Sequence, residues 1–130
     1  MADEQARRLI NRTRLLLAGF VAGLVISGVT AFPLPMEVNY LASQLPDSGS
    51  LPEWIRQVQT GLNETEAKYP FLFYGTDWLA FGHLVIAIAF FGPIKDPVRN
   101  IWVIEWGMMA CALVIPLALI CGPIRGIPLW

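Results

Sequence analysis

The sequence predicts an all-α membrane protein with three transmembrane helices. Three apolar runs, 15–36, 78–94 and 101–124, carry this prediction, because each holds at most one ionisable side chain. The first run has none, the second has only His83, and the third has only Glu105. A helix of about 20 apolar residues crosses a hydrocarbon layer about 30 Å thick with its backbone polar groups bonded internally. The alternating segments that a membrane β-barrel needs are not visible.

The first span, at about 12–34, is predicted to end near Pro33 and Pro35, because proline interrupts a helix. Its apolar stretch is longer than the h-region of about 7–15 residues in a signal peptide, so we interpret it as an uncleaved helix. Small residues recur along it every four positions, at Gly19, Gly23 and Ser27. This spacing lets two helix backbones approach closely in lipid and predicts a helix–helix contact face.

Between the first two spans, an outer segment at 37–75 is predicted to hold one amphipathic helix at about 51–67. The sequence from Ser50 to Glu53 has the pattern of a capping box, with Pro52 in the first turn. Four apolar side chains share one face of this helix: Trp54, Ile55, Val58 and Leu62. We expect that face to lie on the headgroup layer or over the mouth of the helix bundle.

The second span, at about 76–94, is predicted to begin near Gly75 or Asp77, with Asp77 as the candidate N-cap, and to end near Gly92–Pro93. The third span, at about 100–122, contains Pro116, which removes one backbone amide and predicts a kink. Aromatic residues lead into the second span and are typical of a belt at the membrane surface: Tyr69, Phe71, Phe73, Tyr74 and Trp78.

The three spans are interpreted as a single transmembrane domain covering residues 1–130. The chain ends on an apolar stretch, 124–130, which is compatible with entry into a fourth helix that would follow Trp130. A thin bundle of three helices with a small-residue face on the first span also favours a homo-oligomer or a place in a larger membrane complex.

The distribution of charge predicts the orientation of the chain. Six of the nine basic residues lie in the N-terminal tail and in the linker between the last two spans: Arg7, Arg8, Arg12, Arg14, Lys95 and Arg99. The positive-inside rule places both regions in the cytoplasm, so the 37–75 segment and the C-terminus are expected outside. There is no basic patch with interleaved aromatic residues, so nucleic-acid binding has no support.

His83 has three interpretations: a neutral structural histidine, a station for protons or ions, or a ligand for a metal or a tetrapyrrole. Folding the chain back at the linker predicts that His83 is level with Cys111 and within a turn of Met108, a soft set suited to copper(I). A single histidine cannot hold a bis-histidine haem by itself. Two alanines share the helical face of His83 and predict close packing of that face: Ala80 and Ala87.

Glu105 is more costly to bury in the membrane than His83, because placing an ionised carboxylate at mid-membrane costs about 2.5 kcal/mol or more. It is interpreted either as a group that reaches the cytoplasm or pairs with Arg12 or Arg99, or as a functional carboxylate for protons and cations. Lys95 and Arg99 fit a tight turn that sets orientation, or contacts with anionic headgroups or a partner protein. The fold-back geometry separates His83 from Glu105 in depth by about 10 Å or more, which excludes a direct pair.

Four stretches, Asp77–His83, Gly92–Asn100, Trp102–Glu105 and Gly122–Pro128, resemble a group of small uncharacterised bacterial multi-pass inner-membrane proteins. The resemblance covers roughly the second half of the chain. It implies a location in the bacterial inner membrane and implies no activity.

The sequence favours a non-enzymatic accessory or scaffold subunit that acts through helix–helix packing. No nucleophile–base pair, phosphate-binding loop, pair of catalytic carboxylates or CxxC motif is present, and no cofactor is required by the sequence. Two alternatives stay open: a conduit for protons, ions or small solutes that uses Glu105 and His83, and a metal or tetrapyrrole site at His83.

Overall fold

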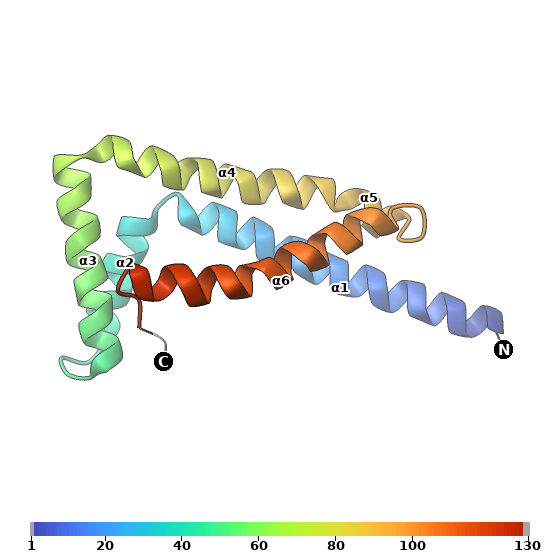
Figure 1. Cartoon of the computed structure of the whole chain (residues 1–130), viewed down its shortest axis with the longest axis horizontal. Helices are drawn as coiled ribbons and strands as arrows, with labels where there is room; N and C mark the ends of the chain where they lie inside the picture. Colours follow the sequence, from blue (N-terminus) through green and yellow to red (C-terminus); the bar gives the residue numbers. More distant parts are fainter. Residues whose placement is uncertain (1, 129–130) are drawn as a thin grey trace. The chain divides into compact units, whose positions relative to one another are not determined.

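The computed structural model describes residues 2–128 and is helical, with no strand in that range. In chain order the elements are α1 (Ala2–Ala31), α2 (Leu34–Gln44), α3 (Ser50–Lys68), the 3₁₀ turn η1 (Pro70–Leu72), α4 (Phe73–Ala89), α5 (Phe91–Lys95) and α6 (Ile101–Ile124) (Figure 1).

Three helical segments within residues 2–128 are long and apolar enough to cross a membrane: Glu4–Ala31, Pro70–Lys95 and Ile101–Ile124. The all-helical class and the three candidate spans are therefore confirmed at the level of length and composition. The first and second candidate spans begin eight and six residues before the predicted bounds, and the other ends differ by three residues or fewer. The second candidate span is interrupted at Phe90, between α4 and α5.

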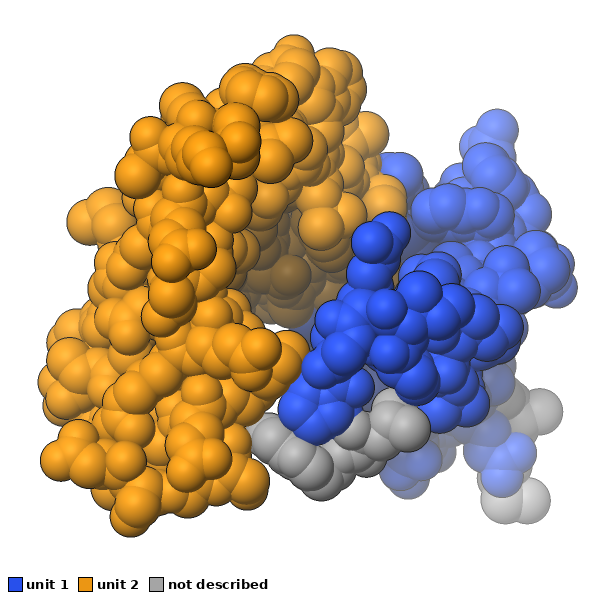
Figure 2. Space-filling view, turned by 60° about the vertical axis from the view of Figure 1, so that its left-hand side comes forward, with its two compact units in different colours: residues 1–19, 89–130 blue, residues 20–88 orange. Residues whose placement is uncertain are grey.

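The chain divides into two compact units, coloured separately in Figure 2. The first joins residues 1–19 with residues 89–130, and the second comprises residues 20–88. The boundary falls inside α1 and at the end of α4, so the first unit contains the N-terminal part of α1 with α5 and α6, and the second contains the rest of α1 with α2, α3 and α4.

In the 20–88 unit, α1 and α4 meet at a glycine. A Cβ placed on Gly28 would lie 2.9 Å from the carbonyl oxygen of Ala80 and 3.1 Å from the side chain of Leu84. Both predicted packing alanines of α4 are buried, Ala80 at 0% and Ala87 at 2% exposure. Since a Cβ contact with a backbone oxygen at 2.9 Å is too close, only glycine allows this approach without a shift.

The same unit holds α2, a helix that the sequence analysis missed. Pro33 and Pro35 do interrupt α1, but the chain turns and begins α2 at once. Pro35 occupies the first turn of α2, where the missing amide would have no partner anyway. The side chains of Asn39, Gln59 and Asn63 then join α2 to α3 through three hydrogen bonds of 3.0–3.2 Å.

The expected capping box at α3 is wrong. The N-cap is Gly49 at φ 126°, and no side chain caps the helix. Because α3 begins one residue earlier than the box requires, Ser50 is already inside the helix. The Glu53 amide, which would have donated to the Ser50 hydroxyl, donates to the carbonyl oxygen of Gly49 at 3.0 Å. Arg56 instead closes the preceding loop by donating to the carbonyl oxygens of Pro46 and Asp47.

The prediction that Asp77 caps the second span is also wrong. α4 begins at Phe73, directly after η1, whose first residue is Pro70. The proline-led 3₁₀ turn already supplies the geometry that starts the helix. Asp77 therefore lies one turn inside α4, where its side chain does not serve the helix end.

In the other unit, the turn between α5 and α6 is ordered by side-chain hydrogen bonds. The Asn100 amide donates to the carbonyl oxygens of Gly92 and Asp96, at 3.3 and 2.9 Å. Arg14 donates to the carbonyl oxygen of Lys95 at 2.7 Å. Phe90, only 3% exposed, packs over Gly107, where a Cβ would lie 2.6 Å from the ring.

α6 contains Pro116, as expected, and it continues past Gly122–Pro123 to Ile124. Its end is a Schellman motif, in which Gly126 has φ 70°. The amide of Ile127 bonds the carbonyl oxygen of Gly122 at 2.9 Å, and that of Gly126 bonds Pro123 at 3.0 Å. The helix therefore ends two residues beyond the predicted bound at about residue 122.

Candidate functional site

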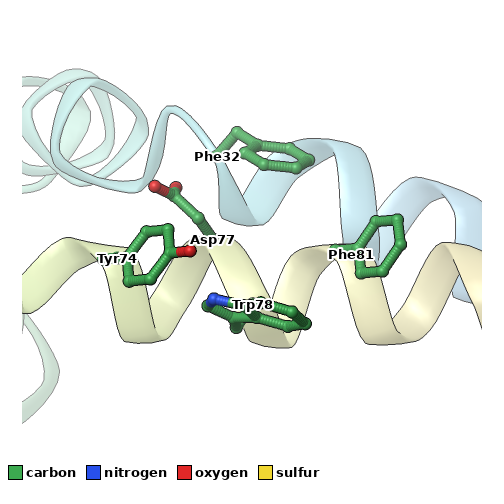
Figure 3. Close-up of a pocket in the computed structure, with 5 residues that line it drawn as sticks. All are labelled: Phe32, Tyr74, Asp77, Trp78 and Phe81. Carbon is green, nitrogen blue, oxygen red and sulfur yellow. The ribbon is translucent and has the colours of Figure 1, made fainter.

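An aromatic cavity lies in the 20–88 unit, where the end of α1 faces the first turns of α4 (Figure 3). Its volume is about 340 Å³, and its lining is Phe32, Tyr74, Asp77, Trp78 and Phe81. Tyr74, Trp78 and Phe81 recur at four- and three-residue spacing, which brings them onto one face of α4. The sequence analysis assigned Tyr74 and Trp78 to a membrane belt and did not foresee a cavity.

The rings of this cavity are arranged edge to face. The ring centroids of Tyr74 and Trp78 are 6.1 Å apart with planes at 85°, and those of Trp78 and Phe81 are 5.9 Å apart at 89°. Such pairs hold each other's orientation, because the positive edge of one ring meets the negative face of the next. The row of rings on α4 is therefore ordered by its own contacts.

Asp77 is the only charged residue of the cavity lining. It is partly buried, and among residues 4–128 no side chain or backbone group forms a hydrogen bond or ion pair with it. Figure 3 shows its carboxylate extending from α4 toward the segment that carries Phe32. The cavity thus combines an apolar aromatic wall with one negative charge that has no counter-charge within the described side chains.

His83 lies two turns further along α4 and is partly buried. Its Nδ1 is 2.8 Å from the carbonyl oxygen of Leu79, one turn earlier in the same helix. A carbonyl oxygen can only accept, so Nδ1 donates this hydrogen bond, while Nε2 has no hydrogen-bond partner among residues 4–128. This geometry satisfies a structural histidine, and it also leaves Nε2 as the atom that a ligand would meet.

The other residues of the predicted soft metal set belong to the first unit, which joins residues 1–19 with 89–130. Met108 and Cys111 are exposed on α6, whereas His83 belongs to the 20–88 unit. Within the described part of the chain, no three His, Cys, Asp or Glu side chains come close enough together to hold a metal ion.

Glu105 is exposed on α6, one turn after the helix begins. The expected ion pair with Arg12 or Arg99 is not formed, and its carboxylate has no hydrogen-bond partner among residues 4–128. Arg99 is held by its backbone instead, since its amide donates to the Asp96 carboxylate at 3.0 Å. Glu105 is therefore available to an external partner.

The small-residue face of α1 is open. Gly19, Gly23 and Ser27 are exposed, and a Cβ placed on either glycine would meet no atom within 4 Å. The face of α1 that packs inside the chain is a different one, formed by Leu17, Val21 and Gly28. Sequence reasoning missed Gly28, although its spacing from Leu17 and Val21 follows the helical repeat of one face.

The side chains of Lys95 and Arg99 are exposed at the turn between α5 and α6. Neither side chain has a hydrogen bond or ion pair with another described residue. Asn100 and Arg14 donate hydrogen bonds to the backbone of this turn, so the backbone that carries the two free cationic side chains is ordered.

These features define a small helical protein with three segments suited to membrane crossing, an aromatic cavity and an open helix face. No protein-family model matches the chain, and neither a curated protein nor a solved structure is found to be similar to it. The resemblance to small bacterial inner-membrane proteins stays a prediction.

Proposed function

We propose that this protein is a non-enzymatic accessory or scaffold subunit of a membrane complex and that it assembles through the open face of α1. The observation that carries the proposal is the empty space around Gly19 and Gly23, where an added Cβ meets nothing within 4 Å. The partner is a second copy of the chain or a helix of a larger complex.

Exposure alone does not require a partner, because lipid covers the apolar surface of any spanning helix. Glycine is the informative residue, because a helix with glycine at an interior position is less stable than the same helix with alanine there by about 1 kcal/mol. A lipid-facing position gains nothing in return for that cost. Two glycines and a serine at four-residue spacing are therefore better explained by the close approach of another helix.

The small interior of the chain supports the same proposal. In the most apolar stretches of the three spans, only 17%, 22% and 11% of the residues are buried within the chain. α6 has the least burial, and all ten residues from Cys111 to Ile120 are exposed. A protein with so little internal packing gains stability when its spans pack against further helices.

The proposal includes an orientation in the bacterial inner membrane. The N-terminus and the Lys95–Arg99 turn are cytoplasmic, and the segment with α2 and α3, together with the C-terminus, lies outside. Its support is the excess of basic residues in the first two regions, since Lys and Arg resist translocation. The free side chains of Lys95 and Arg99 would then contact anionic headgroups or a cytoplasmic partner.

The test is assembly after substitution of the open glycines. Gly19→Ile and Gly23→Ile each place a branched side chain where a partner backbone is expected, so the purified chain should lose its complex on a native gel. Because nothing within the chain occupies this space, the helix content measured by circular dichroism should stay unchanged.

Gly82→Ile is the matched control. Gly82 is also a helix glycine with no atom within 4 Å of an added Cβ, but it lies on α4 and lacks a glycine four residues away. It should leave the complex intact, as should His83→Ala and Glu105→Gln. A complex that survives both α1 substitutions would contradict the proposal.

A further inference from the structure

The aromatic cavity on α4 has a chemistry that helix packing does not need. Four of its five lining residues are aromatic, and the fifth is a carboxylate. A belt that only anchors a helix at the membrane surface requires rings at a common depth. It does not require an unpaired carboxylate among those rings, and Asp77 lines this open cavity together with them.

The charge of the cavity restricts its occupant. An anion would meet the carboxylate of Asp77, which would repel it. A bare divalent metal ion would find one carboxylate, whereas such ions take several oxygen or nitrogen ligands. A neutral apolar molecule would fit the rings but would leave Asp77 beside it without a counter-charge.

An organic cation satisfies both parts of the lining. A quaternary ammonium group carries one positive charge under an apolar shell of methyl groups. Aromatic rings attract such a cation through their negative faces, with Trp the strongest of the three ring types. Asp77 supplies the opposite charge, and the weak hydration of the cation makes its transfer from water less costly than that of a primary ammonium.

We propose that the cavity formed by Phe32, Tyr74, Asp77, Trp78 and Phe81 binds a quaternary ammonium group, with Asp77 as its counter-charge. The group belongs either to a free cation such as choline or to the choline headgroup of a lipid. This proposal goes beyond the assembly role and does not depend on it, since no residue of the open α1 face lines the cavity.

The experiment uses the full chain in nanodiscs of phosphatidylglycerol, which contain no choline. Choline is titrated and its binding followed by saturation-transfer NMR, beside its neutral isostere 3,3-dimethylbutan-1-ol. Choline should bind saturably, and at least about fivefold more tightly than the isostere, because only choline gains from the charge and the rings together. This comparison needs no variant.

Two variants locate the site. Asp77→Asn and Trp78→Leu should each weaken choline binding by at least about fivefold. Their matched controls, Glu64→Gln and Trp102→Leu, alter an exposed carboxylate on α3 and an exposed tryptophan on α6, and should leave binding unchanged. Helix content is measured for every variant. If a variant does not fold, the comparison of choline with its neutral isostere on the unmodified chain tests the proposal.

A second set of nanodiscs distinguishes the source of the group. When half of the lipid is phosphatidylcholine, a cavity that takes lipid headgroups loses binding of free choline, whereas a cavity that takes a free cation keeps it. Either result supports the proposal. Absence of saturable binding, equal binding of the neutral isostere, or full binding by Asp77→Asn would overturn it and leave the rings as a membrane belt.

Discussion

At the scale of single residues, the glycines of this chain have two opposite roles that sequence spacing alone does not separate. Gly28 permits contact inside the chain, because an added Cβ would lie 2.9 Å from the carbonyl oxygen of Ala80. Gly19 and Gly23 are open, and an added Cβ would meet nothing within 4 Å. The difference is set by which side of α1 faces α4 within the 20–88 unit.

Gly28→Ala should therefore destabilise the chain, by about 1–3 kcal/mol, since the methyl group must displace a backbone oxygen and the Leu84 side chain. Gly82→Ala should instead stabilise the chain by up to about 1 kcal/mol, because the added methyl group meets no atom within 4 Å and alanine favours the helix. Unfolding in a detergent titration measures both. Equal effects of the two substitutions would show that α1 and α4 do not meet at Gly28.

Asp77, His83 and Glu105 show how far single residues were predictable. His83 and Glu105 were identified because each is the one ionisable group that stands out in an apolar run. Asp77 precedes such a run and was taken for a helix cap. Its neighbourhood depends on the place of Phe32, which is 45 positions away in sequence, in the turn between α1 and α2. A contact between elements of that kind leaves no local pattern in the sequence.

At the scale of the elements, the three candidate spans were predictable because a long apolar run constrains length and composition at once. The helix ends were less predictable. Proline at 33 and 35 was interpreted as a stop, yet the same residues begin α2, since proline both interrupts one helix and suits the first turn of the next. Which role dominates depends on the packing of α2 against α3.

That packing is stabilised by Asn39, whose side chain takes part in all three hydrogen bonds between α2 and α3. Asn39→Ala should loosen α2 by about 1–2 kcal/mol, because exposed hydrogen bonds each contribute at the lower end of their range. Amide hydrogen exchange should accelerate throughout Leu34–Gln44 and remain unchanged in α6. Gln57→Ala, at an exposed position of α3, is the control, and equal exchange in the two variants would contradict the role of Asn39.

At the scale of the whole molecule, charge gives the information about orientation that apolar spans lack. Each span would fit a membrane in either direction, since length and hydropathy are the same from both ends. The basic groups differ, because Arg12 and Arg14 lie in α1 just before its apolar stretch, while Glu37 follows that stretch in the first turn of α2. Orientation is therefore a property of the loops and termini.

The proposed orientation can be read from cysteine accessibility in the full chain. Cys111 and Cys121, both exposed on α6, are first replaced by alanine so that they do not react. Ser48→Cys, in the loop before α3, should then react with a membrane-impermeant maleimide in intact spheroplasts, whereas Val98→Cys, at a position 71% exposed, should react only after lysis. The physical reason is the cost of moving Lys95 and Arg99 across the bilayer together with Val98. The reverse labelling would invert the proposed orientation and place the aromatic cavity on the cytoplasmic side, while leaving the three spans and the open face of α1 as they are.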